Sequence, residues 1–314
     1  MKIFINLPTW LGDSVMASVA IYAIKEYFKD ANFVFYGSFV SIELYKNFPN
    51  SIFIKEEKSK RYIQILKLLK SLGVFDYAFS FRSALSSKII LRLLKTKKRF
   101  CFDKNSFKDS HQVLKYLYFI ENALNLKTSL YSLQLPIKPK NKIKLKNNKK
   151  LLGLNPGGAF GNAKRWQSED FAKVALYFSN DYEIIIFGST QEKDICDNIE
   201  QILVKNNIYP KNLCGKTSIK NLCQNISFLD LFISNDSGSL HIAAVYKIKT
   251  IAIFGPTKFT QTSPWDNKNA LIVHLDLPCM PCMQRICPLG HHKCMKDLSA
   301  NLVIEKAKEL INLV

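Results

Sequence analysis

The chain alternates short apolar runs with stretches of helical spacing. In its first part, the strand candidates, rich in aromatic and β-branched residues, are KIFIN, NFVFYG, SIFIK, DYAFSF and RFCFD. Between them, apolar residues recur at helical spacing over 14–28, 41–47, 61–72, 85–94 and 110–125. Strands that alternate with helices form parallel sheets with crossover helices. The near-continuous apolar strands further indicate a sheet that is covered on both faces.

A second alternating set follows a lysine-rich stretch. Its strand candidates are KLLGLNPGG, YEIIIFGS, KNLCG, DLFISND and TIAIFGP. Its helix candidates are 168–178, 191–205, 218–226 and 237–245, and an amphipathic helix covers 299–313. The pattern predicts two Rossmann-like α/β units, 1–137 and 151–314, joined by the linker 138–150. Packing of helix 299–313 back on the first unit is left open. Because ligands bind outside the carboxyl ends of such strands, we expect the site in a cleft between the two units.

Composition fits a folded protein of two domains. The 314 residues are 47% hydrophobic, which allows a large core and argues against disorder. No apolar run approaches the roughly 18 residues of a membrane-spanning helix. The first residues, MKIFINLPTW, are too short and too soon broken by Pro8 for a secretory signal. We therefore expect a cytoplasmic protein with reduced thiols.

The charge balance points to an anionic partner. The formal net charge is +20, from 45 Lys and Arg against 25 Asp and Glu. Such an excess favours nucleic acid, an anionic membrane or a phosphorylated substrate. A lysine-rich composition without functional meaning is the alternative.

The first loop with residue types that suit ligand binding follows a predicted strand in LNPGGAFGNAKRWQSEDF, 154–171. Gly157 and Gly158 let the backbone approach a ligand and direct N–H groups at phosphate, and Lys164 adds positive charge. The loop is neither a Walker A loop nor a GxGxxG fingerprint. A glycine-rich turn beside a basic loop is the structural alternative.

Two more strand ends of the second half carry polar loops. In IIIFGSTQEKD, Glu192 follows a strand and can accept both hydroxyls of a ribose, or it serves only the first turn of a helix. In FISNDSGSLHIAA, a helix begins directly after the strand, so Ser237 and Gly238 border an anion site at its N-terminus. Asp236 as a helix cap and His241 as a core histidine are the alternatives.

Together, NPGGAFGNAKRW, FGSTQEKD, NDSGSLHIAA, FGPT at 254–257 and the early WLGD resemble the ADP-heptose:lipopolysaccharide heptosyltransferases, most of all their heptosyltransferase II branch. The resemblance covers nearly the whole chain and is strongest over 151–260. It implies a GT-B fold: two Rossmann-like domains with parallel sheets that face each other across the active site. It implies an ADP-heptose donor and no cofactor.

The resemblance also assigns roles to the residues of the second half. Lys164 and the backbone of Gly157 and Gly158 would contact the donor diphosphate, and Glu192 would hold the ribose. The loop 215–218, with Thr217, would border the adenine. Asp236 would contact the heptose or order its loop, while Ser237, Gly238 and His241 would lie at the phosphates.

Asp13, in NLPTWLGDSVMA, stands where a nucleotide-binding strand usually carries a phosphate loop. A carboxylate there repels phosphate, but it can take the proton of a sugar hydroxyl. In the heptosyltransferase interpretation Asp13 is the general base, and one in-line displacement inverts the anomeric centre. No paired carboxylates suited to a divalent metal are evident, so we expect metal independence. The alternative is that Asp13 only caps a helix that starts at Ser14.

The implied acceptor is an anionic Kdo–lipid A that already carries one heptose, at the inner face of the cytoplasmic membrane. The net charge would favour peripheral contact with that membrane, and KSKRYIQILKLLKSLG, 58–73, is a basic amphipathic candidate. A crossover helix packed on the sheet is the alternative. Arg82, Ser83 and Lys88 are candidates for contact with acceptor phosphates.

Four cysteines lie close together in CMPCMQRICPLGHHKCM, 279–295. Their spacing is C-x2-C-x4-C-x6-C, which leaves a structural zinc site, disulfides or free thiols open for Cys279, Cys282, Cys287 and Cys294.

Other functions compete with the heptosyltransferase interpretation. A basic nucleic-acid-binding protein would explain the charge, but no recognition module is visible and we expect no nucleic-acid partner. Heptosyltransferase I is one further alternative, and a GT-B enzyme that uses a UDP or GDP sugar is another. A UDP- or GDP-sugar enzyme would differ mainly in the loop on the adenine side of the donor.

Overall fold

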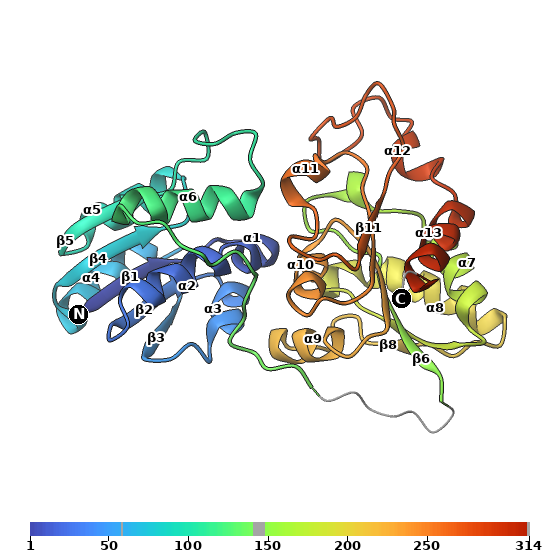
Figure 1. Ribbon diagram of the computed structural model, residues 1–314, viewed down its shortest axis with the longest axis horizontal. Helices are drawn as coiled ribbons and strands as arrows, with labels where there is room; N and C mark the ends of the chain where they lie inside the picture. Colours follow the sequence, from blue (N-terminus) through green and yellow to red (C-terminus); the bar gives the residue numbers. More distant parts are fainter. Residues whose placement is uncertain (58, 141–147, 313–314) are drawn as a thin grey trace. The chain divides into compact units, whose positions relative to one another are not determined.

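The computed structural model describes residues 1–57, 59–140 and 148–312. The chain folds as two compact units, Met1–Ile137 and Lys138–Val314, and each contains one parallel sheet with helices on its faces (Figure 1). The predicted α/β class with two Rossmann-like units is confirmed. Most of the predicted linker lies outside the described residues.

The first unit is built on a five-stranded sheet in the order β3-β2-β1-β4-β5. Its strands are β1 (Lys2–Asn6), β2 (Asn32–Gly37), β3 (Ser51–Lys55), β4 (Phe75–Ser80) and β5 (Thr96–Cys101). Its helices are α1 (Leu11–Met16), α2 (Ser18–Tyr27), α3 (Phe39–Tyr45), α4 (Arg61–Leu72), α5 (Leu85–Leu93) and α6 (Gln112–Leu124). All the pairings are parallel, so the loops after β1, β2 and β4 lie at one edge.

The predicted helix 14–28 is two helices. α1 begins at Leu11, and Ala17 separates it from α2. Trp10 occupies the N-cap position and makes no side-chain capping bond. The alternative that Asp13 caps a helix starting at Ser14 is therefore wrong, because Asp13 already lies in the first turn.

The second unit has a six-stranded sheet in the order β11-β10-β9-β6-β7-β8. Its strands are β6 (Lys150–Asn155), β7 (Tyr182–Ile186), β8 (Lys211–Asn212), β9 (Leu231–Asn235), β10 (Thr250–Ile253) and β11 (Ala270–Val273). Its α-helices are α7 (Ser168–Phe178), α8 (Lys193–Lys205), α9 (Ile219–Ile226), α10 (Gly238–Val245), α11 (Phe259–Thr262), α12 (Lys293–Lys296) and α13 (Ala300–Asn312), with short 3-10 turns at Asn162–Lys164 (η1) and Thr190–Glu192 (η2).

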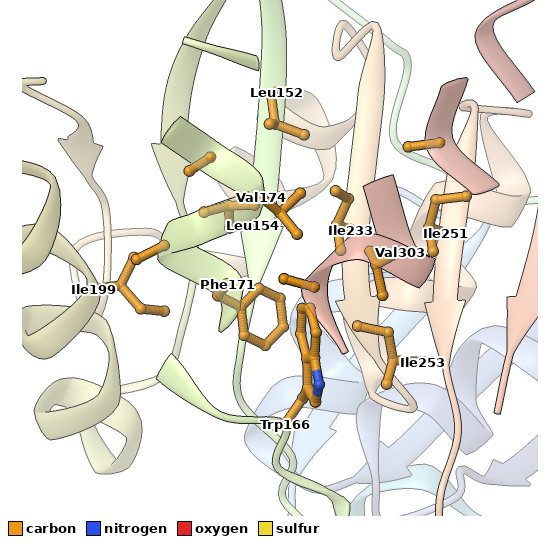
Figure 2. Close-up of a cluster of buried hydrophobic side chains, with 14 of the residues drawn as sticks. Leu152, Leu154, Trp166, Phe171, Val174, Ile199, Ile233, Ile251, Ile253 and Val303 are labelled. Atoms are coloured by element: carbon orange, nitrogen blue, oxygen red, sulfur yellow. The ribbon is translucent and has the colours of Figure 1, made fainter. Parts of the chain in front are cut away.

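The core of the second unit gathers around Trp166. This side chain is fully buried, packs edge-on against Phe171 and donates its indole N–H to the Leu298 backbone oxygen at 2.8 Å. Val303 of α13 joins the same cluster (Figure 2). α13 therefore packs on α7, β10 and β11 of its own unit. The apolar face of α13 is thus used within its own unit, and packing on the first unit stays an open prediction. In the described part of the chain, no helix is long and apolar enough to span a bilayer.

Candidate active site

The three loops singled out in the second half follow β6, β7 and β9. These strands are neighbours and parallel, in the order β9-β6-β7. Their carboxyl ends therefore meet at one edge of the sheet, which is where such sheets bind ligands.

Lys164 and Asp236 meet at this edge. Lys164 Nζ lies 2.5 Å from Asp236 Oδ2, and the two side chains are 12% and 4% exposed. The Thr257 hydroxyl donates to the same carboxylate oxygen at 2.7 Å. Lys164 Nζ also lies 4.9 Å from the centroid of the Phe160 ring. The ammonium is thus held at the start of α10 by a carboxylate and an aromatic face.

Ser237 occupies the N-cap position of α10 but makes no capping bond to that helix. Its hydroxyl instead accepts from Asn155 Nδ2 at 3.0 Å and lies 3.3 Å from Ser234 Oγ. Gly238 is the first helical residue. This eight-residue helix presents its N-terminal N–H groups at the edge, where they attract an anion.

His241 lies one turn into α10 and is 3% exposed. The sequence interpretation placed it beside the donor phosphates. The structure buries it, as it buries the other residues of α10 from Ser239 to Ala244. The core alternative for His241 therefore gains support.

Glu192 forms a capping box with Ser189. Its Oε2 accepts from the Ser189 backbone N–H at 2.7 Å and from the Ser189 hydroxyl at 2.9 Å. A Cβ at Gly157 would lie 2.1 Å from Glu192 Oε1, so the loops after β6 and β7 touch and only glycine fits there. At Gly158 a Cβ would make an ordinary 3.4 Å contact with Lys164 Cβ. Glu192 thus stabilises the first turn of the helix, which was the structural alternative in the sequence analysis. Its binding of the ribose stays a prediction.

Thr217 lies in the loop before α9. Gly215, with φ of +67°, turns this loop and donates its N–H to the Gly188 backbone oxygen at 2.9 Å. Ser218 caps α9 by accepting from Asn221 at 3.2 Å. The loop therefore lies beside the end of β7, and Thr217 is half-buried there.

Asp13 lies at the corresponding edge of the first unit. Its Oδ1 accepts a hydrogen bond from the Tyr116 hydroxyl at 3.2 Å. Tyr116 is buried, and its ring packs against Phe81 and Phe102 at centroid distances of 5.6 and 4.9 Å. Burial, followed by the charge of Asp13, raises the pKa of Tyr116 well above the ordinary value, so the phenol stays protonated and donates.

Arg82, after β4, is committed to neighbours within the unit. Its Nη1 donates to Glu56 Oε2 at 2.7 Å, and its Nε donates to the Leu7 backbone oxygen at 2.5 Å. Arg82 and Glu56 are 11% and 3% exposed. Arg82 thus braces the loop from β1 to Asp13, and its contact with an acceptor phosphate stays a prediction. Ser83, half-buried, and Lys88, exposed on α5, stay predicted acceptor contacts.

The cysteine-rich loop lies against the glycine loop. The Arg285 backbone oxygen accepts from the Ala163 N–H at 3.1 Å, and His292 Nε2 lies 2.8 Å from the Ala163 oxygen. A Cβ at Gly161 would lie 2.4 Å from the Arg285 oxygen. The loop therefore braces the segment that carries Lys164, a role that the sequence did not reveal.

The four cysteines of this loop line one small cavity of about 20 Å³. All are free, and Cys294 has its pKa raised to about 11, first by burial and then by the nearby Cys282, Cys287 and Cys279 thiols. Among the residues with described positions, no three His, Cys, Asp or Glu side chains are placed to hold a metal ion. The structure thus gives the zinc hypothesis no support.

Sequence reasoning missed Tyr116, Glu56 and Thr257. Each contacts its partner across a long separation, such as 103 residues for Tyr116 and Asp13. No local spacing could have paired them, although the apolar helix 110–125 and the FGPT segment were recognised as elements.

Two parallel α/β units, one with a carboxylate at its ligand edge and the other with glycines, a lysine and a helix N-terminus, have the fold of the GT-B glycosyltransferases. The family model "Glycosyltransferase family 9 (heptosyltransferase)" matches residues 65–293. The chain belongs to this family, as the sequence predicted.

Individual relatives support the same family membership. The chain is 64% identical over 314 residues to lipooligosaccharide heptosyltransferase 2 of Campylobacter jejuni serotype O:2, covering 99% of this chain and 98% of the relative. It is 30% identical to lipooligosaccharide heptosyltransferase 2 of Haemophilus influenzae, over 51% of this chain and 47% of the relative. The structure of Escherichia coli ADP-heptose heptosyltransferase II aligns with a TM-score of 0.80 at 20% identity, over 99% of this chain and 98% of that one. The comparisons do not favour the nucleic-acid-binding alternative.

Proposed function

We propose that the chain transfers a heptose from ADP-heptose to an inner core of lipooligosaccharide that already bears one heptose. The observation that carries the proposal is the position of Lys164 and Asp236 at the N-terminus of α10. The near full-length similarity to a heptosyltransferase 2 supports the choice of sugar and acceptor.

The edge of the second unit would bind the donor. The N–H groups at the start of α10 and the Lys164 ammonium would face the diphosphate, with Ser237 beside them. Lys164 would exchange Asp236 for phosphate when the donor binds, which frees Asp236, still held by the Thr257 hydroxyl, to contact the heptose. Charge that develops on the ADP leaving group would be stabilised by the same groups. Glu192 and Thr217 would hold the ribose and border the adenine.

The edge of the first unit would activate the acceptor. Asp13 takes the proton of the acceptor hydroxyl, whose oxygen forms a bond to the anomeric carbon as the bond from that carbon to the ADP oxygen breaks. The electron pair of the broken bond leaves with ADP. A single displacement inverts the anomeric centre. Ser83 and Lys88 would contact acceptor phosphates.

Peripheral contact with the cytoplasmic membrane is supported by charge and by α4. The net charge is +20. On α4, Ile65 is buried in the core, whereas Tyr62, Ile63 and Leu66 are exposed. Exposed apolar residues beside cations suit the surface of an anionic bilayer. Co-sedimentation with vesicles of anionic lipid should therefore exceed that with neutral vesicles, and equal binding to both would contradict this part of the proposal.

The function is tested by transfer from ADP-heptose, in the presence of EDTA, to core acceptors that carry either no heptose or one. We expect product on the one-heptose acceptor and a rate loss of about 10²- to 10⁴-fold in Asp13→Asn. Product only on the acceptor without heptose would instead indicate a heptosyltransferase I. Absence of product on both, with transfer from another nucleotide sugar, would contradict the donor. Loss of activity in EDTA would contradict metal independence.

A further inference from the structure

We propose that Tyr116 is a positioning residue that holds the Asp13 carboxylate in its reactive orientation through the hydrogen bond from its hydroxyl. The inference rests on the proposed function, in which Asp13 is the general base. It adds a residue that is far from Asp13 in the sequence and that need not touch the substrate.

The geometry supports a fixed donor. Tyr116 Oη lies 3.2 Å from Asp13 Oδ1, and the residue is 4% exposed. Its ring packs against Phe81 after β4 and Phe102 after β5, so its position is set by the sheet edge and not by α6 alone. A phenol clamped in this way can only donate to a carboxylate. It therefore restricts rotation of the Asp13 side chain, which lowers the cost of reaching a reactive geometry.

The chain offers a matched control in Tyr45. This tyrosine is fully buried, and its hydroxyl donates to the Ser14 backbone oxygen of the same helix, α1, at 2.8 Å. Tyr45→Phe removes an equally buried hydroxyl and one hydrogen bond to α1, but leaves the bond to Asp13. A role confined to the stability of α1 would make Tyr45→Phe and Tyr116→Phe alike.

Tyr45 is itself close enough to contribute to the raised pKa of Tyr116, as the last of its causes. The other charged groups on the neighbouring elements are common to both variants. They are His111, which accepts from the Val113 N–H at 3.2 Å at the start of α6, the buried Lys115 on α6, and the Arg82–Glu56 pair. Neither substitution removes them. Tyr116→Phe also removes a side-chain hydrogen bond with Gln112, so the comparison with Tyr45→Phe tests both bonds of the Tyr116 hydroxyl, and the Asp13→Asn background described below separates the bond to Asp13.

The test is the pH profile of kcat/KM for heptosyl transfer. Loss of a donor to the ionised carboxylate disfavours the charged form, so the acid limb of Tyr116→Phe should move to higher pH by about 1 unit. Above the limb, the rate should fall about 10-fold. Tyr45→Phe should keep the wild-type limb. The inference is overturned if the limbs of the two variants coincide.

Two further measurements separate this inference from the proposed base. In an Asp13→Asn background, Tyr116→Phe should change the remaining rate by less than about twofold, because its effect acts through Asp13. Substitution of 3-fluorotyrosine at 116 keeps the fold and strengthens the donor, so the acid limb should move to lower pH; an unmoved limb overturns the inference even if Tyr116→Phe fails to fold. Full activity of Asp13→Asn alone would contradict the proposed base. If Asp13→Asn is inactive but the acid limb of the Tyr116→Phe pH profile stays at the wild-type pH, only the role of Tyr116 is contradicted.

Discussion

In the described parts of the two units, a buried ion pair lies at the ligand edge of each sheet, and the two pairs are alike in burial. Lys164 and Asp236 are 12% and 4% exposed, and Arg82 and Glu56 are 11% and 3% exposed. Their cations are held differently. Arg82 donates in two directions, to Glu56 and to the Leu7 oxygen, which fixes it as a brace. Lys164 has a compact ammonium on a flexible stem, which can exchange one anion for another.

Because the two pairs are equally buried, burial alone does not distinguish the roles that we propose for them. What distinguishes them is the next neighbour. Arg82 also donates a hydrogen bond to the backbone oxygen of Leu7, in the loop that precedes Asp13, whereas Lys164 lies beside the N-terminus of α10. We therefore propose a positioning role for the first pair and a donor-binding role for the second.

The largest effect should come from breaking the first pair. Arg82→Met removes the guanidinium that faces the buried Glu56 carboxylate, and we expect the free energy of unfolding to fall by about 3–5 kcal/mol. The double variant Arg82→Met with Glu56→Gln should recover much of this loss. Urea unfolding measures both. An equal loss in the double variant would show that the brace to Leu7, and not the charge, dominates.

Replacing the other cation should affect transfer. Lys164→Met should lower kcat/KM for ADP-heptose by about 10²-fold, which is about 2.7 kcal/mol of transition-state stabilisation. Lys173→Met is the control, because Lys173 forms only an exposed pair with Asp170 and should leave the rate unchanged. Initial rates at low donor concentration measure kcat/KM for both variants. A Lys164→Met enzyme as fast as the control would remove Lys164 from the donor site.

A smaller effect is expected where the loops after β6 and β7 touch. Gly157→Ala places a methyl group on Glu192, so this side chain must give up its capping box with Ser189. We expect a cost of about 1–3 kcal/mol in stability and a higher KM for the donor. Gly158→Ala, which meets only an ordinary contact, should be near neutral. Thermal melting and donor titration of the pair measure the difference, and equal behaviour would contradict the described contact.

The smallest effect concerns the loop that braces Lys164. The His292 N–H donates to Cys287 Sγ at 3.3 Å, and such backbone bonds lower the pKa of Cys287, whereas burial raises that of Cys294 to about 11. A lowered pKa means more thiolate at neutral pH. Iodoacetamide should thus label Cys287 before Cys294 between about pH 6 and 9. Peptide mass spectrometry checks the order, and faster labelling of Cys294 would contradict it.

The sequence predicted the elements better than the contacts. β1, β2 and β3 have the predicted bounds because each is one uninterrupted apolar run. The start of α1 was predicted too late, since Trp10 makes no capping bond while Asp13 and Ser14 imitate a cap. β11 was missed because ALIV is short and lies among polar residues.

The candidate site was predicted in its strand ends and not in its pairings. Lys164, Asp236 and Ser237 could be recognised as polar residues that follow buried strands. That Lys164 would pair with Asp236 depends on the order β9-β6 in the sheet. The same holds for Arg82. The sequence indicated a cation that could contact a phosphate, but it could not show that this cation pairs with Glu56 in the fold.

The most direct measurement for this account is calorimetric titration of ADP into the wild type, Lys164→Met and Arg82→Met. The account predicts that Lys164→Met weakens ADP binding about 10-fold or more and that Arg82→Met, where folded, binds ADP as the wild type does. Weaker ADP binding in Arg82→Met alone, or wild-type affinity in Lys164→Met, would contradict the division of the two ion pairs into a brace and a donor contact.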